Sequence, residues 1–145
     1  MANFYIIRGL PGTGKTTLGN TLAGPEATFA ADDYFYDENG VYNFDPSQLG
    51  KAHAQCQLNV KNALVNGKSA IENGIIESFS VAVANTFSCR WEFQPYLDMA
   101  KEIGGIRVFL IDLFDNETPI EELFERNVHG VPRHVFANMY DRWER

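Results

Sequence analysis

Residues 9–16 read GLPGTGKT, a complete match to the pattern G-x-x-x-x-G-K-S/T. An apolar stretch from Phe4 to Arg8 leads into the motif, and a stretch with helical character leads out of it from Lys15. Because glycine makes up only about 7% of average sequences, the pattern arises by accident in roughly one chain of this length in a couple of hundred. The sequence therefore predicts a strand, a phosphate-binding loop (P-loop) and a helix in succession.

The residue types in this motif suit the binding of a triphosphate. Glycines let backbone N–H groups approach phosphate oxygens, and the following helix directs its amino-terminal dipole at the same anion. Lys15 is expected to bridge the β- and γ-phosphates, and the Thr16 hydroxyl to ligate Mg²⁺. A glycine-rich turn that only caps a helix is the alternative, which the rarity of the pattern disfavours. We expect ATP, a purine nucleotide, to contact Gly9, Pro11, Gly12, Thr13, Gly14, Lys15, Thr16 and Thr17.

Composition and charge narrow the class of protein. The chain has 145 residues, of which 45% are hydrophobic and 21% charged, which favours one globular domain over residues 1–145. The net charge of −7 opposes docking onto long phosphate backbones and favours small substrates or nucleic-acid ends. Apolar stretches are too short to cross a bilayer, and the start does not resemble a signal peptide, so we expect a cytoplasmic protein without membrane contact.

The order of elements predicts alternating strands and helices, and hence an α/β fold with a parallel sheet covered on both faces. A helix is expected to open with Asp45 as N-cap and to close at Asn66-Gly67. The following residues, 68–80, fit either further helical turns or a loose connection. Strands are expected at 4–8, 28–31, 81–85 and 106–113, and helices at 15–24, 45–67, 91–103, 118–127 and from 132 onward.

Candidate catalytic residues follow two of these elements. Asp32 and Asp33 stand where the second strand is expected to end, at the sheet edge where ligands bind in open α/β folds. One carboxylate there can accept a proton from an attacking hydroxyl, and its neighbour, Asp33, can help hold Mg²⁺ through water; an acidic loop start or N-cap is the alternative. Arg126 can neutralise charge that develops on the phosphates, although a lone arginine on a surface helix is usually only solvated.

Together these residues resemble the small P-loop kinases related to the kinase domain of bacteriophage polynucleotide kinase, which include zeta-toxin-like kinases. The resemblance runs from about Phe4 to Tyr140 and rests on the sequence GLPGTGKTT, Asp32-Asp33 before a tyrosine, the run Ala84-Asn85-Thr86, and Arg126-Asn127 followed by HGVP. It implies a P-loop NTPase fold with a four-stranded sheet in the order 2-3-1-4. It also implies transfer of the γ-phosphoryl of ATP to a hydroxyl, with Asp32 as the general base and Arg126 as a lid arginine, and with Lys15 stabilising the transferred charge.

Two positions, and the length of one stretch, depart from the pattern of the family. Phe35 stands where polynucleotide kinases have an arginine that holds the acceptor's phosphate, and Asn85 stands where they have an aspartate. The stretch Glu72–Ser80 is longer than the family usually has. The acceptor is therefore left open among a nucleotide, a modified base, a nucleic-acid 5′-hydroxyl and another small molecule. An ATP-dependent binding module or switch is the alternative function.

Aromatic residues near these positions have two interpretations. They can offer a stacking surface for a base, or they can pack in the core and in loops, which is the commoner role. The residues concerned are Tyr34, Phe35, Tyr36, Phe87 and Trp91.

Overall fold

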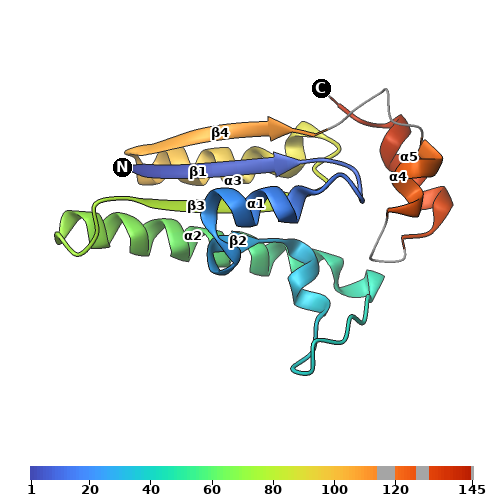
Figure 1. Ribbon diagram of the computed structural model, residues 1–145, viewed down its shortest axis with the longest axis horizontal. Coiled ribbons are helices and arrows are strands. Elements are labelled where there is room, and N and C mark those ends of the chain that lie inside the picture. Colours follow the sequence, from blue (N-terminus) through green and yellow to red (C-terminus); the bar gives the residue numbers. More distant parts are fainter. Residues whose placement is uncertain (114–119, 127–130, 145) are drawn as a thin grey trace.

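The computed structural model describes residues 1–113, 120–126 and 131–144, and its centre is a sheet of parallel strands (Figure 1). The strands are β1 (Ala2–Arg8), β2 (Thr28–Phe29), β3 (Phe79–Asn85) and β4 (Ile106–Asp112). They lie in the order β2-β3-β1-β4 and all pair in parallel. The α/β fold and the strand order expected for a P-loop NTPase are both confirmed.

The strand register brings the polar residues at the strand ends to one edge of the sheet. Arg8, the last residue of β1, pairs with Asn85 at the end of β3 and with Asp112 at the end of β4. Since β1 is central, the loop that follows it starts in the middle of this carboxyl edge. The fold thus places the GLPGTGKT loop where ligands bind in open α/β sheets.

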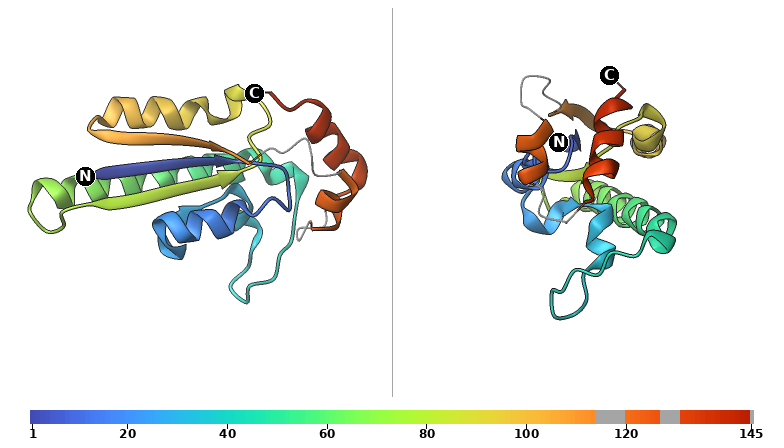
Figure 2. Two further views of the ribbon diagram at one scale, coloured as in Figure 1. Left: turned by 45° about the horizontal axis from the view of Figure 1, so that its top comes forward. Right: turned by 90° about the vertical axis from the view of Figure 1, so that its right-hand side faces the viewer.

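The long helices α2 (Leu49–Glu72) and α3 (Arg90–Ile103) cover one face of the sheet (Figures 1 and 2). Their apolar sides pack on the side chains of β1 and β3 that point to this face and form the main core. The fully buried members include Phe4, Ile6, Val83, Val60, Leu64 and Tyr96.

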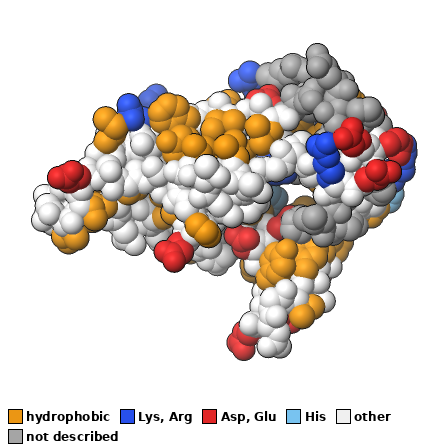
Figure 3. Space-filling model, viewed as in Figure 1, with side chains coloured by type: hydrophobic (Ala, Val, Ile, Leu, Met, Phe, Trp, Pro, Cys, Tyr) orange, Lys and Arg blue, Asp and Glu red, His pale blue; other side chains and the backbone are white. Residues whose placement is uncertain are grey.

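The helix α1 (Lys15–Ala23) covers the other face, where Leu18 and Leu22 pack near Ile7 and Ala82. This helix does not reach across β4, and Phe109, which points to the same face as Ile111, is exposed on that strand. Figure 3 shows hydrophobic side chains gathered where β4 lies in Figure 1. Helices therefore lie on both faces as predicted, but the cover over β4 is incomplete.

The prediction that Asn66-Gly67 ends a helix was wrong, because α2 continues to Glu72. Gly67 serves close packing instead: a Cβ atom there would lie 2.7 Å from ring carbons of Phe79. The Glu72–Ser80 stretch is the end of this helix, a short turn and the start of β3, which begins two residues earlier than expected. Of the two alternatives for residues 68–80, further helical turns are confirmed as far as Glu72.

The second strand is shorter than predicted, because it ends at Phe29 and a 3₁₀ helix, η2 (Ala31–Phe35), takes its place. The carboxylate of Asp33 accepts a hydrogen bond from the backbone N–H of Ala30 at 3.0 Å and so caps this turn. Asp32 and Asp33 consequently lie on a helical turn rather than directly at a strand end. The chain then makes a tight turn at Asn39-Gly40, between the bridged residues Tyr36 and Tyr42.

The remaining short elements complete the chain. Asp45 caps a 3₁₀ turn, η3 (Pro46–Gln48), through Ser47, and α2 follows it directly. Another turn, η1 (Pro25–Ala27), joins α1 to β2. The helices α4 (Ile120–Glu125) and α5 (Arg133–Asp141) lie beyond the carboxyl edge of the sheet (Figure 2). The Thr118-Pro119 helix start and the HG pair at 129–130 lie outside the described residues.

The apolar side of α5 packs on the buried Leu10 through Met139 and Tyr140, with Trp143 beside them. Over the described part of the chain, helices fall short of the length and apolar character that a bilayer span requires.

Candidate phosphate-binding and catalytic site

The predicted P-loop connects β1 to α1 and is built on backbone conformations that favour glycine. Gly12 has a φ of 89° and Gly14 a φ of 84°, which L-residues with side chains rarely adopt. Gly9 donates its N–H to the carbonyl of Thr86 at 3.3 Å, so the loop is anchored to the residue that follows β3. The loop therefore starts from a fixed position at the sheet edge.

One carbonyl inside the loop gathers the donors that shape it. The oxygen of Leu10 accepts from Thr13 twice, at 3.3 Å from the backbone N–H and at 2.7 Å from the hydroxyl. The Lys15 ammonium donates to the same oxygen at 3.1 Å. Lys15 therefore lies along the inside of the loop, where its charge is available to a bound anion.

The start of α1 is suited to an anion. Gly14 caps the helix without a side-chain hydrogen bond, and the first turn contains no acidic residue. The N–H groups of a first helical turn have no partner within the helix, and they carry the positive end of its dipole. Thr16 and Thr17 in this turn are exposed. Their position makes them accessible to a phosphate and to its metal ion.

Asp32 and Lys15 lie close enough to affect one another. Burial lowers the pKa of Lys15 to about 8, and the negative charge of Asp32 acts in the opposite direction. The Tyr42 hydroxyl donates to Asp32 at 3.4 Å, and burial, followed by the Asp32 charge, raises the pKa of Tyr42. The phenol therefore stays protonated and remains a hydrogen-bond donor to the Asp32 side chain.

The expected magnesium ligands have different surroundings. Thr16 lies at the exposed start of α1, whereas Asp33 caps η2, the alternative role considered for it. Within the residues described, His, Cys, Asp and Glu form no group of three that could hold a metal by itself. This donor set fits Mg²⁺ bound with a nucleotide, because Mg²⁺ usually takes one or two protein ligands and completes its shell with phosphates and water.

Arg126 lies just beyond the last residue of α4, and its guanidinium pairs with Glu122 at 2.5 Å. Both side chains are about half exposed. The structure therefore shows Arg126 paired with a residue of the helix that precedes it, in an ion pair that is exposed to water. The expected contact with phosphate requires that this ion pair open.

Phe35 and Asn85, the two departures from the family, both have structural partners. Phe35 is buried, and its ring meets those of Tyr34, Tyr42 and Phe44 edge-on. The side-chain oxygen of Asn85 accepts the backbone N–H of Ala31 at 2.8 Å and so ties β3 to η2. These residues support the turn that carries Asp32 rather than offering charge to an acceptor.

The aromatic residues divide between the two interpretations. Phe35 and Phe87 are buried, with 5% and 1% of their surface exposed, and act in the core. Tyr34, Tyr36 and Trp91 are exposed by 41%, 43% and 75%. Of the five residues considered, these three have surface that a ligand can reach.

Sequence reasoning missed Arg8, which is 2% exposed at the end of the central strand. Its guanidinium donates to the carbonyl of Phe87 at 2.8 and 3.0 Å and to that of Ser88 at 3.2 Å, and it forms an ion pair with Asp112 at 3.6 Å. The centre of the Trp143 ring lies 4.3 Å from the guanidinium carbon, and the Nη2 group of Arg8 donates to the Glu144 carbonyl. The sequence did contain one signal for this role, namely a charged residue at the end of an otherwise apolar strand.

Arg8 links the C-terminal segment to the P-loop strand. The N–H of Glu144 donates to the Ser88 carbonyl at 2.7 Å, and the Arg142 side chain donates to the Ser88 hydroxyl at 3.0 Å. Asp112, the last residue of β4, pairs with Arg8. The end of α5 is thus held against the start of α3.

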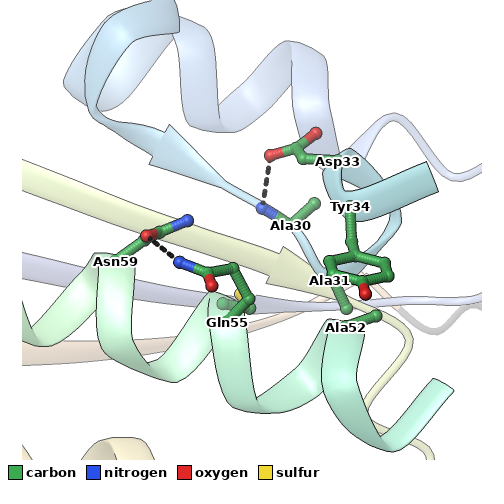
Figure 4. A pocket seen from close by; sticks show the side chains of 8 residues that line it. Ala30, Ala31, Asp33, Tyr34, Ala52, Gln55 and Asn59 are labelled. Atoms are coloured by element: carbon green, nitrogen blue, oxygen red, sulfur yellow. Dashed lines mark hydrogen bonds between the residues drawn. The ribbon is translucent and has the colours of Figure 1, made fainter. Parts of the chain in front are cut away.

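Two hollows lie on either side of α2. A cavity of about 140 Å³ lies between η2 and α2, and Figure 4 shows its lining. Asp33, Tyr34, Gln55, Cys56 and Asn59 contribute to it. A wider hollow of about 500 Å³ lies between α2 and α3, with lining residues that include His53, Cys89, Trp91, Glu92 and Arg142. The first hollow is beside the turn that carries Asp32.

Solved structures similar to this chain include an RNA repair complex and a gluconokinase. The structure of the Pnkp1/Rnl/Hen1 RNA repair complex matches 98% of this chain and 44% of the other chain, with a TM-score of 0.64 and 16% identity. A gluconokinase from Sinorhizobium meliloti 1021 matches 99% of this chain and 75% of the other, with a TM-score of 0.55 and 13% identity. At these identities the likeness shows the fold alone, an α/β fold of the P-loop type.

A curated human protein, NEDD4-binding protein 2, is 33% identical to this chain over 144 residues. The match takes in 97% of this chain but spans only 8% of the length of the human protein. No protein-family model matches the chain.

Proposed function

We propose that the protein is a kinase that transfers the γ-phosphoryl group of ATP, bound with Mg²⁺, to a hydroxyl acceptor. The observation that carries the proposal is the proximity of Asp32 to Lys15 at the carboxyl edge of the sheet. A carboxylate close to the phosphate-binding ammonium is where a general base must be to activate a hydroxyl for attack on the γ-phosphorus.

Each residue has a defined part in this reaction. The first-turn amides of α1 and the Lys15 ammonium hold the β- and γ-phosphates, and Thr16 would hold the Mg²⁺ that is bound with ATP, which would neutralise charge on the phosphates. Asp33, considered as a water-mediated ligand of this ion, instead caps η2. Asp32 takes the proton of the acceptor hydroxyl while the oxygen of that hydroxyl forms a bond to the γ-phosphorus. The bond from that phosphorus to the β,γ-bridging oxygen breaks, and ADP leaves.

Two side chains adjust the site. Tyr42 donates a hydrogen bond to Asp32 and so helps to fix the orientation of its side chain. Arg126 leaves Glu122 when nucleotide is bound and adds positive charge to the transferred phosphoryl group. Similarity to structures of an RNA repair kinase complex and a gluconokinase supports the reaction class.

A second candidate function is an ATP-dependent binding module. The observation that favours it is the engagement of Phe35 and Asn85 in structural contacts at positions where polynucleotide kinases hold their acceptor. In this function ATP orders α4 and α5, and a partner recognises the ordered state.

One assay separates the two functions. The protein is incubated with ATP labelled on the γ-phosphate and with a panel of nucleosides, nucleotides, gluconate and 5′-hydroxyl oligonucleotides. Transfer that is lost in Asp32→Ala and kept in Glu38→Gln, a change at an exposed acidic residue, supports the kinase. ATP binding without transfer to any of these acceptors supports the module.

A further inference from the structure

Resting on the proposed phosphoryl transfer, we infer that the cavity between η2 and α2 is a nucleobase pocket, so that the acceptor is a nucleoside or the terminal nucleoside of a chain. The pocket takes a single six-membered ring and therefore prefers pyrimidine bases. The sugar hydroxyl of the same molecule reaches Asp32.

The position of the cavity connects it to the catalytic carboxylate. Asp32 and Asp33 are consecutive on η2. Asp33 lines the cavity, whereas Asp32 is directed to Tyr42 and interacts with Lys15. A ligand that places a ring beside Asp33 and a hydroxyl beside Asp32 thus spans the two sides of one helical turn.

The size of the cavity selects one ring. Its lining includes the small side chains of Ala30, Ala31 and Ala52, and its volume is about 140 Å³. A cavity of about 150 Å³ in another protein accommodates one benzene molecule. Pockets that enclose a whole drug-sized ligand start at about 300 Å³. The cavity therefore accommodates a pyrimidine ring, while the sugar remains outside.

The polar lining matches the edge of a base. Gln55 donates its amide to the Asn59 oxygen at 2.8 Å, and both side chains project from α2 into the region that Figure 4 shows. This bond fixes the two amides relative to each other. A carboxamide has two N–H donors and an oxygen with two lone pairs, so the pair retains donors on Asn59 and an acceptor on Gln55. The edge of a pyrimidine base also carries hydrogen-bond donors and acceptors, which can pair with the acceptor on Gln55 and the donors on Asn59.

The charge of the lining excludes an anion. Among the lining residues of this cavity in the described chain, none is Lys, Arg or His. Asp33 contributes a carboxylate, and burial raises the pKa of the Cys56 thiol, which stays neutral. A phosphate or a sugar acid such as gluconate is therefore disfavoured, and a neutral base is favoured.

Tyr34 supplies a ring face at the opening. Its side chain is 41% exposed, and its hydroxyl donates to Gln48 at 3.4 Å. Aromatic side chains with an exposed face stack on bases of any sequence. The tyrosine thus completes the pocket on the side of the solvent.

The test measures transfer kinetics for cytidine, adenosine, ribose and gluconate. We expect kcat/KM to fall in the order cytidine, adenosine, ribose, with no transfer to gluconate. Gln55→Leu and Asn59→Leu raise the KM for cytidine about tenfold, the effect of about 1.4 kcal/mol from a lost hydrogen bond, without changing the KM for ATP. Ala52→Leu fills the cavity and has the same effect. Gln94→Leu, which breaks an equivalent pair with Asp98 on the exposed side of α3, is the matched control and leaves cytidine kinetics unchanged.

The possible results test the base pocket and the phosphoryl transfer separately. Transfer to hydroxyls with an unchanged base preference in all three cavity variants overturns the pocket and leaves the kinase intact. If no hydroxyl is phosphorylated, the proposed function is wrong, and the pocket is decided by titrating cytidine and ribose into the ATP-free protein by calorimetry. Cytidine binding that weakens in the cavity variants supports the pocket, and cytidine binding no tighter than that of ribose overturns it. Circular dichroism confirms that each variant is folded.

Discussion

The Lys15 ammonium donates a hydrogen bond to the carbonyl oxygen of Leu10 at 3.1 Å and thereby lies inside the loop whose ligand it is expected to hold. Burial makes this position unfavourable for a charge, and the pKa of Lys15 falls to about 8, while the Asp32 carboxylate counteracts the fall. The loop therefore holds a cation that is incompletely compensated by the protein. A triphosphate at the start of α1 supplies the missing negative charge.

ATP binding is expected to take up protons above pH 8. The free protein loses the Lys15 proton near this pH, and a bound triphosphate raises the pKa again. Affinity for ATP consequently falls as the pH rises through about 8. Calorimetry at pH 8.5 in buffers of different ionisation enthalpy measures the uptake, which Lys15→Met abolishes. Equal proton uptake in the wild type and this variant would show that another group titrates.

The same pKa predicts how the stability of the ATP-free protein depends on pH. Between pH about 8 and 10.5, Lys15 is protonated in the unfolded chain and neutral in the folded one. The unfolded state then binds more protons, so this residue makes stability rise with pH across that window and adds nothing further above it. Urea unfolding of the wild type and Lys15→Met at several pH values isolates the contribution. Asp32→Asn, which removes the opposing charge, moves the lower limit of the window to lower pH.

Arg8 is expected to be essential for stability. Arg8→Met leaves Asp112 and the Phe87 carbonyl without their buried partner and destabilises the protein by about 3–5 kcal/mol. Arg8→Lys keeps the charge but loses the divided contact with several carbonyls, so its cost is smaller. Chemical denaturation measures both, and Lys61→Met at an exposed position of α2 stays within about 0.5 kcal/mol of the wild type. An Arg8→Met protein as stable as the wild type would refute the role of this network.

Two glycines of α2 are expected to respond oppositely to the same change. Gly67→Ala introduces a Cβ atom 2.7 Å from the Phe79 ring and destabilises by about 1–3 kcal/mol through overpacking. Gly50→Ala meets nothing within 4 Å and stabilises by up to about 1 kcal/mol through the higher helix propensity of alanine. Thermal or urea unfolding compares the two. The double variant Gly67→Ala/Phe79→Leu recovers part of the loss, and an additive double variant would argue against the contact.

Arg126 is expected to act on the rate of transfer rather than on folding. Arg126→Ala lowers kcat by about 10³-fold or more, the range seen for arginines that stabilise phosphoryl transfer, and barely changes unfolding because the Glu122 pair is exposed. Glu122→Gln releases the arginine and raises kcat/KM or leaves it unchanged. The control is Arg133→Ala, which removes an arginine of α5 that pairs with Glu121 of α4. A kcat that Arg126→Ala leaves intact would remove this residue from the mechanism.

Much of the fold was predictable because its signals are local. The P-loop motif, the capping Asp45 and the Gly104-Gly105 helix end each specify their own conformation through turn or cap chemistry. Alternating apolar strands and helices then determine a parallel sheet, although the order of its strands came from the resemblance to known kinases.

The features that the sequence did not predict are those that depend on contacts between residues far apart in the chain. Gly67 appeared to end a helix because its contact with Phe79 cannot be read from neighbouring residues. The network around Arg8 joins residues about 80 and 136 positions apart, and no local pattern announces it. Asp33 was considered both as a metal ligand and as a cap, and only the three-dimensional structure reveals its contact with Ala30.

The most direct test of the account is calorimetric titration of Mg-ATP into the wild type, Lys15→Ala and the charge-matched control Lys61→Ala. We predict saturable one-to-one binding to the wild type and the control, and a loss of at least about tenfold in affinity for Lys15→Ala with unchanged circular dichroism. Equal ATP affinity in all three proteins, or no binding to any, would contradict the assignment of the GLPGTGKT loop as the nucleotide site.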